Sequence, residues 1–342
     1  MGYARFGSRL ARDVVEISHD LGCLDRGGFW AVVVTFEGEV TCVRFGQVVD
    51  TRVTEPQLLL PADWASLTGA WSTSLNETAY RSGLSQIRNR IAAGEVYQAC
   101  LCRVMGHPLA DDADLASLET LVARGNPAPH AGRIFVPEAG LDLLSASPEA
   151  FLIRRGDRIE SRPIKGTATA LSEMLVKDYA ENVMIADLVR NDLSAVCRAG
   201  TVSVDALCSP EEHPGLTHLV TTVSGELRTG LAWYDIMSAT FPPGSVSGAP
   251  KSSAVRVISD LESVPRGPYC GAIGWVDADA NEAELAVGIR TFWADRDASG
   301  QRTLRFGTGG AITWGSDPDQ EWAETELKAA RLIGLASGRL EP

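Results

Sequence analysis

Glu181 is the residue that most clearly requires a binding partner, because its position in a predicted helix places its carboxylate among apolar side chains. In a helix predicted over residues 172–193, Met184, Ile185 and Leu188 share the stripe that begins at Glu181. An unpartnered carboxylate there would cost roughly several kcal/mol or would become protonated. The sequence therefore predicts a partner for Glu181, which is either a metal ion or a basic side chain in a structural ion pair.

A second predicted helix, which has Pro318 in its first turn, offers two more carboxylates. Glu321, Glu324 and Lys328 lie on one stripe of that helix. By themselves they also fit a solvated face of salt bridges. Combined with Glu181, they would make an oxygen-rich site of the kind that Mg²⁺ prefers. The sequence has no His and Cys cluster at zinc spacing that would favour another metal.

Lys165 lies at the end of a predicted apolar strand, directly before a glycine that lets the backbone approach closely. A lysine held in such a place can act as a base or a nucleophile. A lysine at a strand end that extends into water would show the same pattern. Both interpretations are open from the local sequence.

The loop 241–251 is rich in Gly, Pro and Ser, and it leads into a helix predicted over 252–261. Its glycines and the hydroxyls of Ser245 and Ser247 would either bind an anion at the helix N-terminus or simply cap the helix. The spacing is not that of a nucleotide-binding P-loop, so the loop favours a small carboxylate.

The elements that must position these residues indicate an α+β chain. Strand patterns over 96–105, 132–136, 150–154 and 158–165 follow one another before the helix at 172–193, which is unlike a regular βαβ succession. Another helix is predicted from Glu77 to Gly94. We expect residues 1–76 to form a shortened N-terminal subregion and residues 77–338 to form the catalytic region of the same fold.

Composition narrows the class of protein. The 342 residues include 44 Asp and Glu against 31 Lys and Arg, giving a formal charge of −13. This charge disfavours binding to nucleic acid or to an anionic membrane surface, and no apolar run is long enough to span a bilayer. Seven cysteines without a CxxC pair, together with an N-terminus that lacks a signal-peptide pattern, predict free thiols and a cytoplasmic protein.

Taken in order, these segments resemble the chorismate-utilising enzymes, a family that includes anthranilate synthase component I, aminodeoxychorismate synthase component I and the isochorismate and salicylate synthases. The matching segments are Gly94-Glu-Val-Tyr-Gln98, Ser147-Pro-Glu149, Arg162-Pro-Ile-Lys-Gly-Thr167, Ala180-Glu-Asn182, Asp187-Leu-Val-Arg-Asn-Asp192, His218-Leu-Val220, 241–251, Gly267-Pro-Tyr-Cys-Gly271, Ile289-Arg-Thr291 and 317–328. The resemblance implies β-sheets packed as a sandwich with flanking helices.

Two positions separate the branches of this family. Isochorismate and salicylate synthases carry a water-activating lysine where this chain has Gln98, and anthranilate synthases usually carry alanine where it has Lys165. The chain is most similar to aminodeoxychorismate synthases. That resemblance implies that Lys165 attacks C2 of chorismate as the C4 hydroxyl leaves, and that ammonia then attacks C4 and expels the lysine. The product would be 4-amino-4-deoxychorismate, a precursor of 4-aminobenzoate and folate.

The resemblance also implies roles for the other matching residues. Glu181 and Glu324 would hold Mg²⁺ with Glu321 close by, Glu149 would be the general acid, and His218 would lie beside the C4 substituent. The implied substrate-binding residues are Gly166, Thr167, Ser245, Ser247, Tyr269, Arg290, Gly309 and Lys328.

The chain contains no glutaminase motif, because Gly22-Cys-Leu-Asp25 lacks the second glycine of a nucleophile elbow. We therefore expect a separate glutamine amidotransferase subunit to deliver ammonia. Two other aminations fit the family, those of anthranilate synthase component I and of 2-amino-2-deoxyisochorismate synthase. A non-catalytic binding subunit is a further alternative, against which the joint presence of Glu149, Lys165, Glu181 and Glu324 argues.

Overall fold

The expected α+β class is confirmed. The computed structural model describes residues 2–52, 63–168, 170–213, 216–297 and 299–340. The strands of the first half are β1 (Tyr3–Phe6), β2 (Arg9–Ser18), β3 (Phe29–Val34), β4 (Val40–Asp50), β5 (Ser72–Thr73), β6 (Gln98–Pro108), β7 (His130–Val136), β8 (Leu141–Ser147), β9 (Ala150–Arg155), β10 (Arg158–Arg162) and β11 (Ile164–Ala168).

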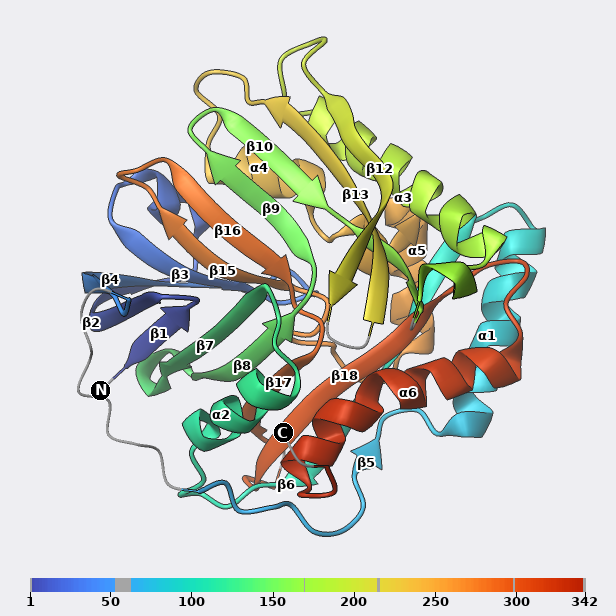
Figure 1. The fold of residues 1–342 in the computed structure, drawn as a ribbon, viewed down its shortest axis with the longest axis horizontal. Coiled ribbons are helices and arrows are strands. Elements are labelled where there is room, and N and C mark those ends of the chain that lie inside the picture. Colours follow the sequence, from blue (N-terminus) through green and yellow to red (C-terminus); the bar gives the residue numbers. More distant parts are fainter. Residues whose placement is uncertain (1, 53–62, 169, 214–215, 298, 341–342) are drawn as a thin grey trace.

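The later strands are β12 (Ser203–His213), β13 (Leu216–Glu226), β14 (Gly248–Ala249), β15 (Ala272–Asp277), β16 (Glu282–Val287), β17 (Thr291–Arg296) and β18 (Arg302–Ile312). The helices are α1 (Glu77–Ala92), α2 (Leu115–Gly125), α3 (Val176–Ser194), α4 (Trp233–Thr240), α5 (Lys251–Leu261) and α6 (Pro318–Ala336). Figure 1 shows α1, α3, α5 and α6 gathered on one side of the strands.

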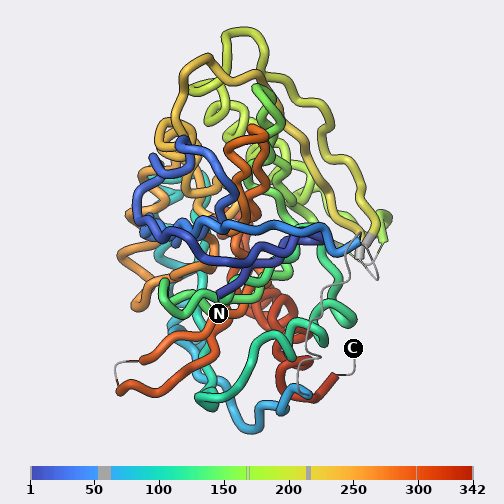
Figure 2. Tube along the Cα trace, turned by 90° about the vertical axis from the view of Figure 1, so that its left-hand side faces the viewer, coloured from blue at the N-terminus to red at the C-terminus, as the bar shows by residue number. Residues whose placement is uncertain are grey.

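The strands form one hydrogen-bonded network of antiparallel pairs. Its N-terminal strands pair with strands that come much later in the sequence, since β1 pairs with β7 and β3 pairs with β15. Both views show these N-terminal strands, in blue, against segments from distant parts of the chain (Figures 1 and 2). Residues 3–50 are therefore integrated into the same sheet network as the rest of the fold.

Strand β6 lies between two hydrophobic cores. One core fills the space between the strand layers, and the other lies under the helices. Cys100 and Cys102 belong to the large cluster shared with β3, β15 and β16. The alternate residues Ala99 and Leu101 belong to the cluster under α1 and α5. Because successive side chains of a strand point to opposite faces, β6 has strands on one face and helices on the other. This arrangement is the expected sandwich with flanking helices.

Two expected boundaries near the site are wrong. The helix expected at 172 begins at Val176, because Leu175 is extended and its backbone N–H donates to Asp178 Oδ2 at 2.8 Å. The strand expected over 158–165 is divided into β10 and β11 at Pro163, which cannot donate a ladder hydrogen bond.

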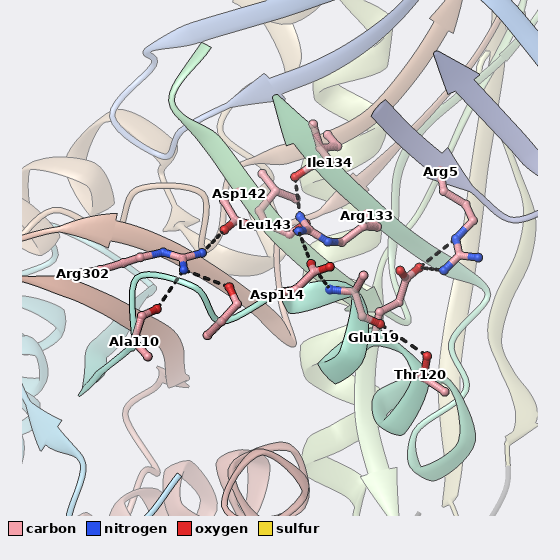
Figure 3. Close-up of polar contacts among 12 residues, drawn as sticks. Arg5, Ala110, Asp114, Glu119, Thr120, Arg133, Ile134, Asp142, Leu143 and Arg302 are labelled. Atoms are coloured by element: carbon pink, nitrogen blue, oxygen red, sulfur yellow. Dashed lines mark hydrogen bonds and ion pairs between the residues drawn. The ribbon is translucent and has the colours of Figure 1, made fainter. Parts of the chain in front are cut away.

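A buried ionic cluster joins α2 and β18 to strands β7 and β8 (Figure 3). The guanidinium of Arg133, which is fully buried, lies 2.7 Å from Asp142 and donates to the carbonyls of Ile134 and Leu143. Arg302 reaches the other oxygen of Asp142 at 2.5 Å. Because two cations share this carboxylate, removing Asp142 would leave buried charge uncompensated.

No helix in the described ranges combines the length and the apolar character that crossing a membrane requires.

Candidate active site

Helix α3 is positioned by a buried amide, Asn182. Its Nδ2 donates to the carbonyl of Leu219 at 2.8 Å and to that of Lys165 at 3.3 Å, and its Oδ1 accepts from the hydroxyl of Thr221. These bonds join α3 to β11 and β13. The adjacent residue Glu181 is thereby held close to the strand that carries Lys165.

Gly166 allows this close approach. It has φ +80, and a Cβ at this position would lie 2.9 Å from the Cβ of Asp178 on α3. Both the backbone conformation and the contact exclude an ordinary side chain. The glycine after Lys165 therefore lets the helix with Glu181 pack against β11.

Lys165 and Glu149 meet at the same loop residue, Ser245. Lys165 Nζ donates to the Ser245 carbonyl at 3.0 Å, whereas the Ser245 hydroxyl hydrogen-bonds the Glu149 carboxylate. Cys100 on β6 also binds this loop, because its backbone N–H donates to the Ser247 carbonyl at 2.8 Å. The Gly, Pro and Ser loop thus brings together two groups that are separated in sequence.

Burial changes the acidity of Glu149. Its side chain is enclosed, and the loss of hydration raises its pKa to about 7, although Ser245, Lys165 and other neighbours favour the charged form. A carboxyl with this pKa can hold a proton near neutral pH and release it during a reaction. This is the property required of a general acid.

We expect Glu149→Gln to become more stable, relative to wild type, as the pH rises from 5 to 8. The folded protein keeps a proton on Glu149 up to pH about 7, whereas the unfolded chain releases it near the ordinary glutamate pKa of 4.5. Wild-type stability therefore falls across this range, by about 1–3 kcal/mol from this group, and the glutamine variant lacks that loss. Urea unfolding at several pH values measures the difference, and a pH-independent difference would contradict the raised pKa.

Helix α6 supplies a carboxylate and a cation at the strand β18. Lys328 Nζ lies 2.6 Å from Glu324 Oε1 and donates to the Gly309 carbonyl at 3.0 Å. Both side chains are 45% exposed, so a ligand can reach them. Burial alone would raise the pKa of Glu324, but Lys328 more than offsets this, and the pKa of Glu324 is lowered. Glu324 is therefore ionised at neutral pH.

Gly309 cannot carry a side chain. A Cβ there would lie 2.5 Å from both Cys102 Sγ and the Leu101 carbonyl. The bare backbone lets β18 pack against β6 while its carbonyl faces Lys328. That the Gly309 backbone binds substrate stays a prediction.

The charges of these residues act on one another across α3, β11 and α6. Lys165 lowers the pKa of Glu149, Glu181 and Glu324, and Lys328 lowers that of Glu149. Glu324 raises the pKa of Glu181 by repulsion. The fold therefore assembles the lysine, the buried acid and two carboxylates in one electrostatic neighbourhood.

The carboxylates fit a hard divalent cation. Burial raises the pKa of Glu181, and within the described residues its carboxylate makes no hydrogen bond or ion pair, so its predicted partner is not an arginine. Glu321 is buried and accepts from the Ser316 hydroxyl at 2.7 Å. No three or more His, Cys, Asp or Glu side chains of the described chain form a metal-binding group by themselves. Mg²⁺ typically uses one or two carboxylates, waters and substrate oxygens, which suits Glu181 and Glu324.

Tyr269 and Arg290 lie on two connected segments. The Cys270 N–H donates to the Gly288 carbonyl at 3.0 Å, which joins the turn of Tyr269 to the segment before Arg290. Tyr269 is buried, which raises its pKa well above the usual value. Arg290 has φ +52 and donates to Asn126 Oδ1 at 3.2 Å. Such strain in a non-glycine residue is typical of functional sites.

Other residues expected in the site lie on β11, on β13 and in the loop before α5. His218 is buried on β13, opposite Thr167 of β11 in the strand register. The side chain of Thr167 is outside the described part of the structure. Ser247 is fully buried and its hydroxyl donates to the Pro243 carbonyl at 2.9 Å, so it stabilises the loop that presents Ser245.

Some contributors were not predicted from the sequence. Asn182 lies in the segment Ala180-Glu-Asn182, but its role in docking α3 depends on three carbonyl and hydroxyl partners from distant strands. Lys177, one turn before Glu181, lowers the pKa of Glu181, Glu321 and Glu324. Its spacing of four from Glu181 is the signal that could have identified it.

Comparison with known proteins finds a matching family model and several relatives. A model of chorismate binding enzymes matches residues 33–334. Anthranilate synthase component 1 of Saccharolobus solfataricus is 34% identical over 274 residues, covering 77% of this chain and 63% of the relative. Aminodeoxychorismate synthase component 1 of Escherichia coli is 31% identical over 336 residues, covering 94% of this chain and 71% of the relative. The chain thus spans less than two thirds of the archaeal relative.

The fold is shared with solved structures. A 2,3-dihydroxybenzoate-specific isochorismate synthase from Bacillus anthracis superimposes with a TM-score of 0.81 at 22% identity, covering 98% of this chain and 96% of that structure. At this identity the likeness establishes the architecture.

Proposed function

Since the chain belongs to the family of chorismate binding enzymes, we propose that it aminates chorismate at C4 to give 4-amino-4-deoxychorismate. The proposal is carried by one observation, that Lys165 and Glu149 both contact Ser245. Lys165 donates to its carbonyl, and Glu149 hydrogen-bonds its hydroxyl. This arrangement supplies an amine nucleophile and a proton donor in one site. Anthranilate formation requires no such nucleophilic lysine.

In the first step, the lone pair of Lys165 Nζ forms a bond to C2 of chorismate. The two ring double bonds shift, and the C4–O bond breaks. The departing hydroxyl takes the proton of Glu149 and leaves as water, which balances the charge. A carboxyl with a pKa of about 7 is suited to this transfer because it is largely protonated at neutral pH.

In the second step, ammonia forms a bond to C4 and the double bonds shift back. The C2–Nζ bond breaks, and its electron pair returns to Lys165. The surplus proton on the new amine passes to the Glu149 carboxylate, which is thereby restored as an acid. We place His218 beside the C4 substituent, with Gly166 and Thr167 lining the ring pocket.

Charge neutralisation orients the substrate. Chorismate is a dianion, and Lys328 offers a cation whose Nζ faces the Gly309 carbonyl. Glu181 and Glu324, with Glu321 close by, would hold Mg²⁺, which supplies Lewis-acid polarisation of the ring diene when bound. The Ser245 and Ser247 loop, Tyr269, Arg290 and the backbone of Gly309 would bind the substrate, with Tyr269, Arg290 and Gly309 at the enolpyruvyl carboxylate.

We expect Arg290→Lys to raise the KM for chorismate by about tenfold and to change kcat less. A guanidinium grips a carboxylate with two parallel hydrogen bonds, and an ammonium cannot reproduce that geometry. Steady-state kinetics would measure the effect. Arg296→Lys is the matched control, because Arg296 is exposed and pairs with the surface residue Asp111. Equal KM values for both variants would contradict the assignment.

Ammonia needs a source. We propose that a separate glutamine amidotransferase subunit supplies it, and that free ammonia replaces that subunit in vitro.

The proposed function is tested by mass spectrometry of the products from purified protein, chorismate, Mg²⁺ and ammonium at pH about 8.5. Aminodeoxychorismate, which an added lyase converts to 4-aminobenzoate, supports the proposal. Anthranilate would show that Lys165 does not decide the position of amination. Absence of an aminated product would overturn the proposed chemistry.

A further inference from the structure

A small cavity adjoins Glu149 on the side of helix α3. It is lined by β9, by the ends of β10 and β16, by the last turns of α3, by the end of α4 and by the loop that carries Ser245. Its volume is about 10 Å³, which corresponds to one water-sized molecule. The cavity therefore lies directly beside the proposed general acid, and a molecule of one heavy atom fits it.

Two oxygen atoms in the lining of the cavity have no hydrogen-bond partner among the residues that the structure describes. Ser161 lines it and is buried, and no other described residue hydrogen-bonds its hydroxyl. Asp192, also in the lining, binds Lys251 Nζ through Oδ2 at 2.8 Å, and Oδ1 has no hydrogen-bond partner within the described ranges. Both oxygens can accept a hydrogen bond from a small molecule in the cavity.

We propose that this cavity binds the ammonia molecule that attacks C4. The inference rests on the proposed amination. Ammonia has the size of water, three N–H donors for the oxygens of Asp192, Ser161 and Glu149, and one lone pair. Because the amine replaces the hydroxyl at C4, a nucleophile held beside the acid that protonates that hydroxyl is close to the reacting carbon.

The charge pattern favours neutral ammonia over ammonium. Lys251 Nζ is held by Asp192 and by the Thr240 carbonyl at 2.6 Å, so one cation already neutralises that carboxylate. A second cation beside it would be repelled. Neutral ammonia avoids this repulsion, and it alone has the lone pair that forms the bond to C4.

The bond changes balance at this position. The lone pair of ammonia forms the N–C4 bond, and the C2–Nζ bond to Lys165 breaks. The proton that the new ammonium group must lose is accepted by the Glu149 carboxylate.

The test compares ammonia with methylamine as nucleophile. Val189 lines the cavity, and Val189→Ala enlarges it. We expect wild type to discriminate strongly against methylamine, and we expect the variant to raise the ratio of methylated to unmethylated product at least tenfold. The matched control is Val122→Ala, which removes the same two methyl groups from the buried face of α2, away from the cavity. It should keep the wild-type ratio.

A second variant acts in the opposite direction. Ser161→Val fills the cavity and removes its hydroxyl, so the KM for ammonia should rise about tenfold or more while the KM for chorismate stays unchanged. Circular dichroism and thermal melting verify that each variant is folded.

The outcomes separate this inference from the function on which it rests. A wild-type protein that forms no aminated product overturns the proposed function and the ammonia site together. An aminated product with unchanged nucleophile selectivity in Val189→Ala, or an unchanged ammonia KM in folded Ser161→Val, overturns the ammonia site alone.

Discussion

Replacing Lys165 by alanine is expected to reduce formation of aminodeoxychorismate on the order of 10³-fold or more. The variant loses the nucleophile that divides a difficult substitution into two easier ones. Folding should be preserved, because Lys165 Nζ makes a single hydrogen bond, to the Ser245 carbonyl, and the side chain is half-buried. Discontinuous assays with product mass spectrometry measure the loss.

Lys177→Ala is the matched control for this experiment. Lys177 also lowers the pKa of Glu181 and Glu324, so its removal reproduces the loss of a positive charge near the carboxylates. It should retain most of the activity. A Lys165→Ala variant that forms aminodeoxychorismate at the rate of the control would disprove the covalent route, and the family assignment would stand.

Replacing Glu181 or Glu324 by glutamine is expected to abolish Mg²⁺-dependent turnover, with a loss of about 10²-fold or more at ordinary Mg²⁺ concentrations. Each substitution removes an anionic oxygen from a site that would otherwise present two carboxylates to the ion. Calorimetric titration with Mg²⁺ in the presence of chorismate should show weakened binding in both variants.

Asp187→Asn controls for the loss of a negative charge on the same helix. Asp187 is 69% exposed and pairs with Arg190, so this variant should bind Mg²⁺ as wild type does. Mg²⁺ affinity equal to wild type in both glutamine variants would exclude Glu181 and Glu324 as the metal-binding pair.

Local sequence patterns determined the chemical content of the site. Helical spacing placed Glu181 beside an apolar stripe, and Glu324 and Lys328 four residues apart. In the structure these two residues form an ion pair at 2.6 Å. The α+β class also followed from successive strand patterns. Such predictions succeed because helix and strand periodicity depend on backbone geometry that each segment carries with it.

Only the tertiary structure decided which of these groups meet. The contact of Lys165 with Ser245 spans 80 residues, and the bonds of Asn182 to Leu219 and Thr221 span 37 and 39. The cavity beside Glu149 is formed by three strands, two helices and a loop, so it could not be predicted from any single segment of the sequence. The raised pKa of Glu149 depends on the same enclosure.

The physical reason is that composition and spacing fix what a side chain can do, whereas desolvation and proximity depend on the packing of distant segments. The sequence by itself determined that this chain carries a lysine nucleophile candidate, an acid and carboxylates suited to a hard cation. The tertiary structure decided that Lys165 and Glu149 share Ser245, that Asn182 docks Glu181 beside them, and that room for one small molecule lies next to the acid.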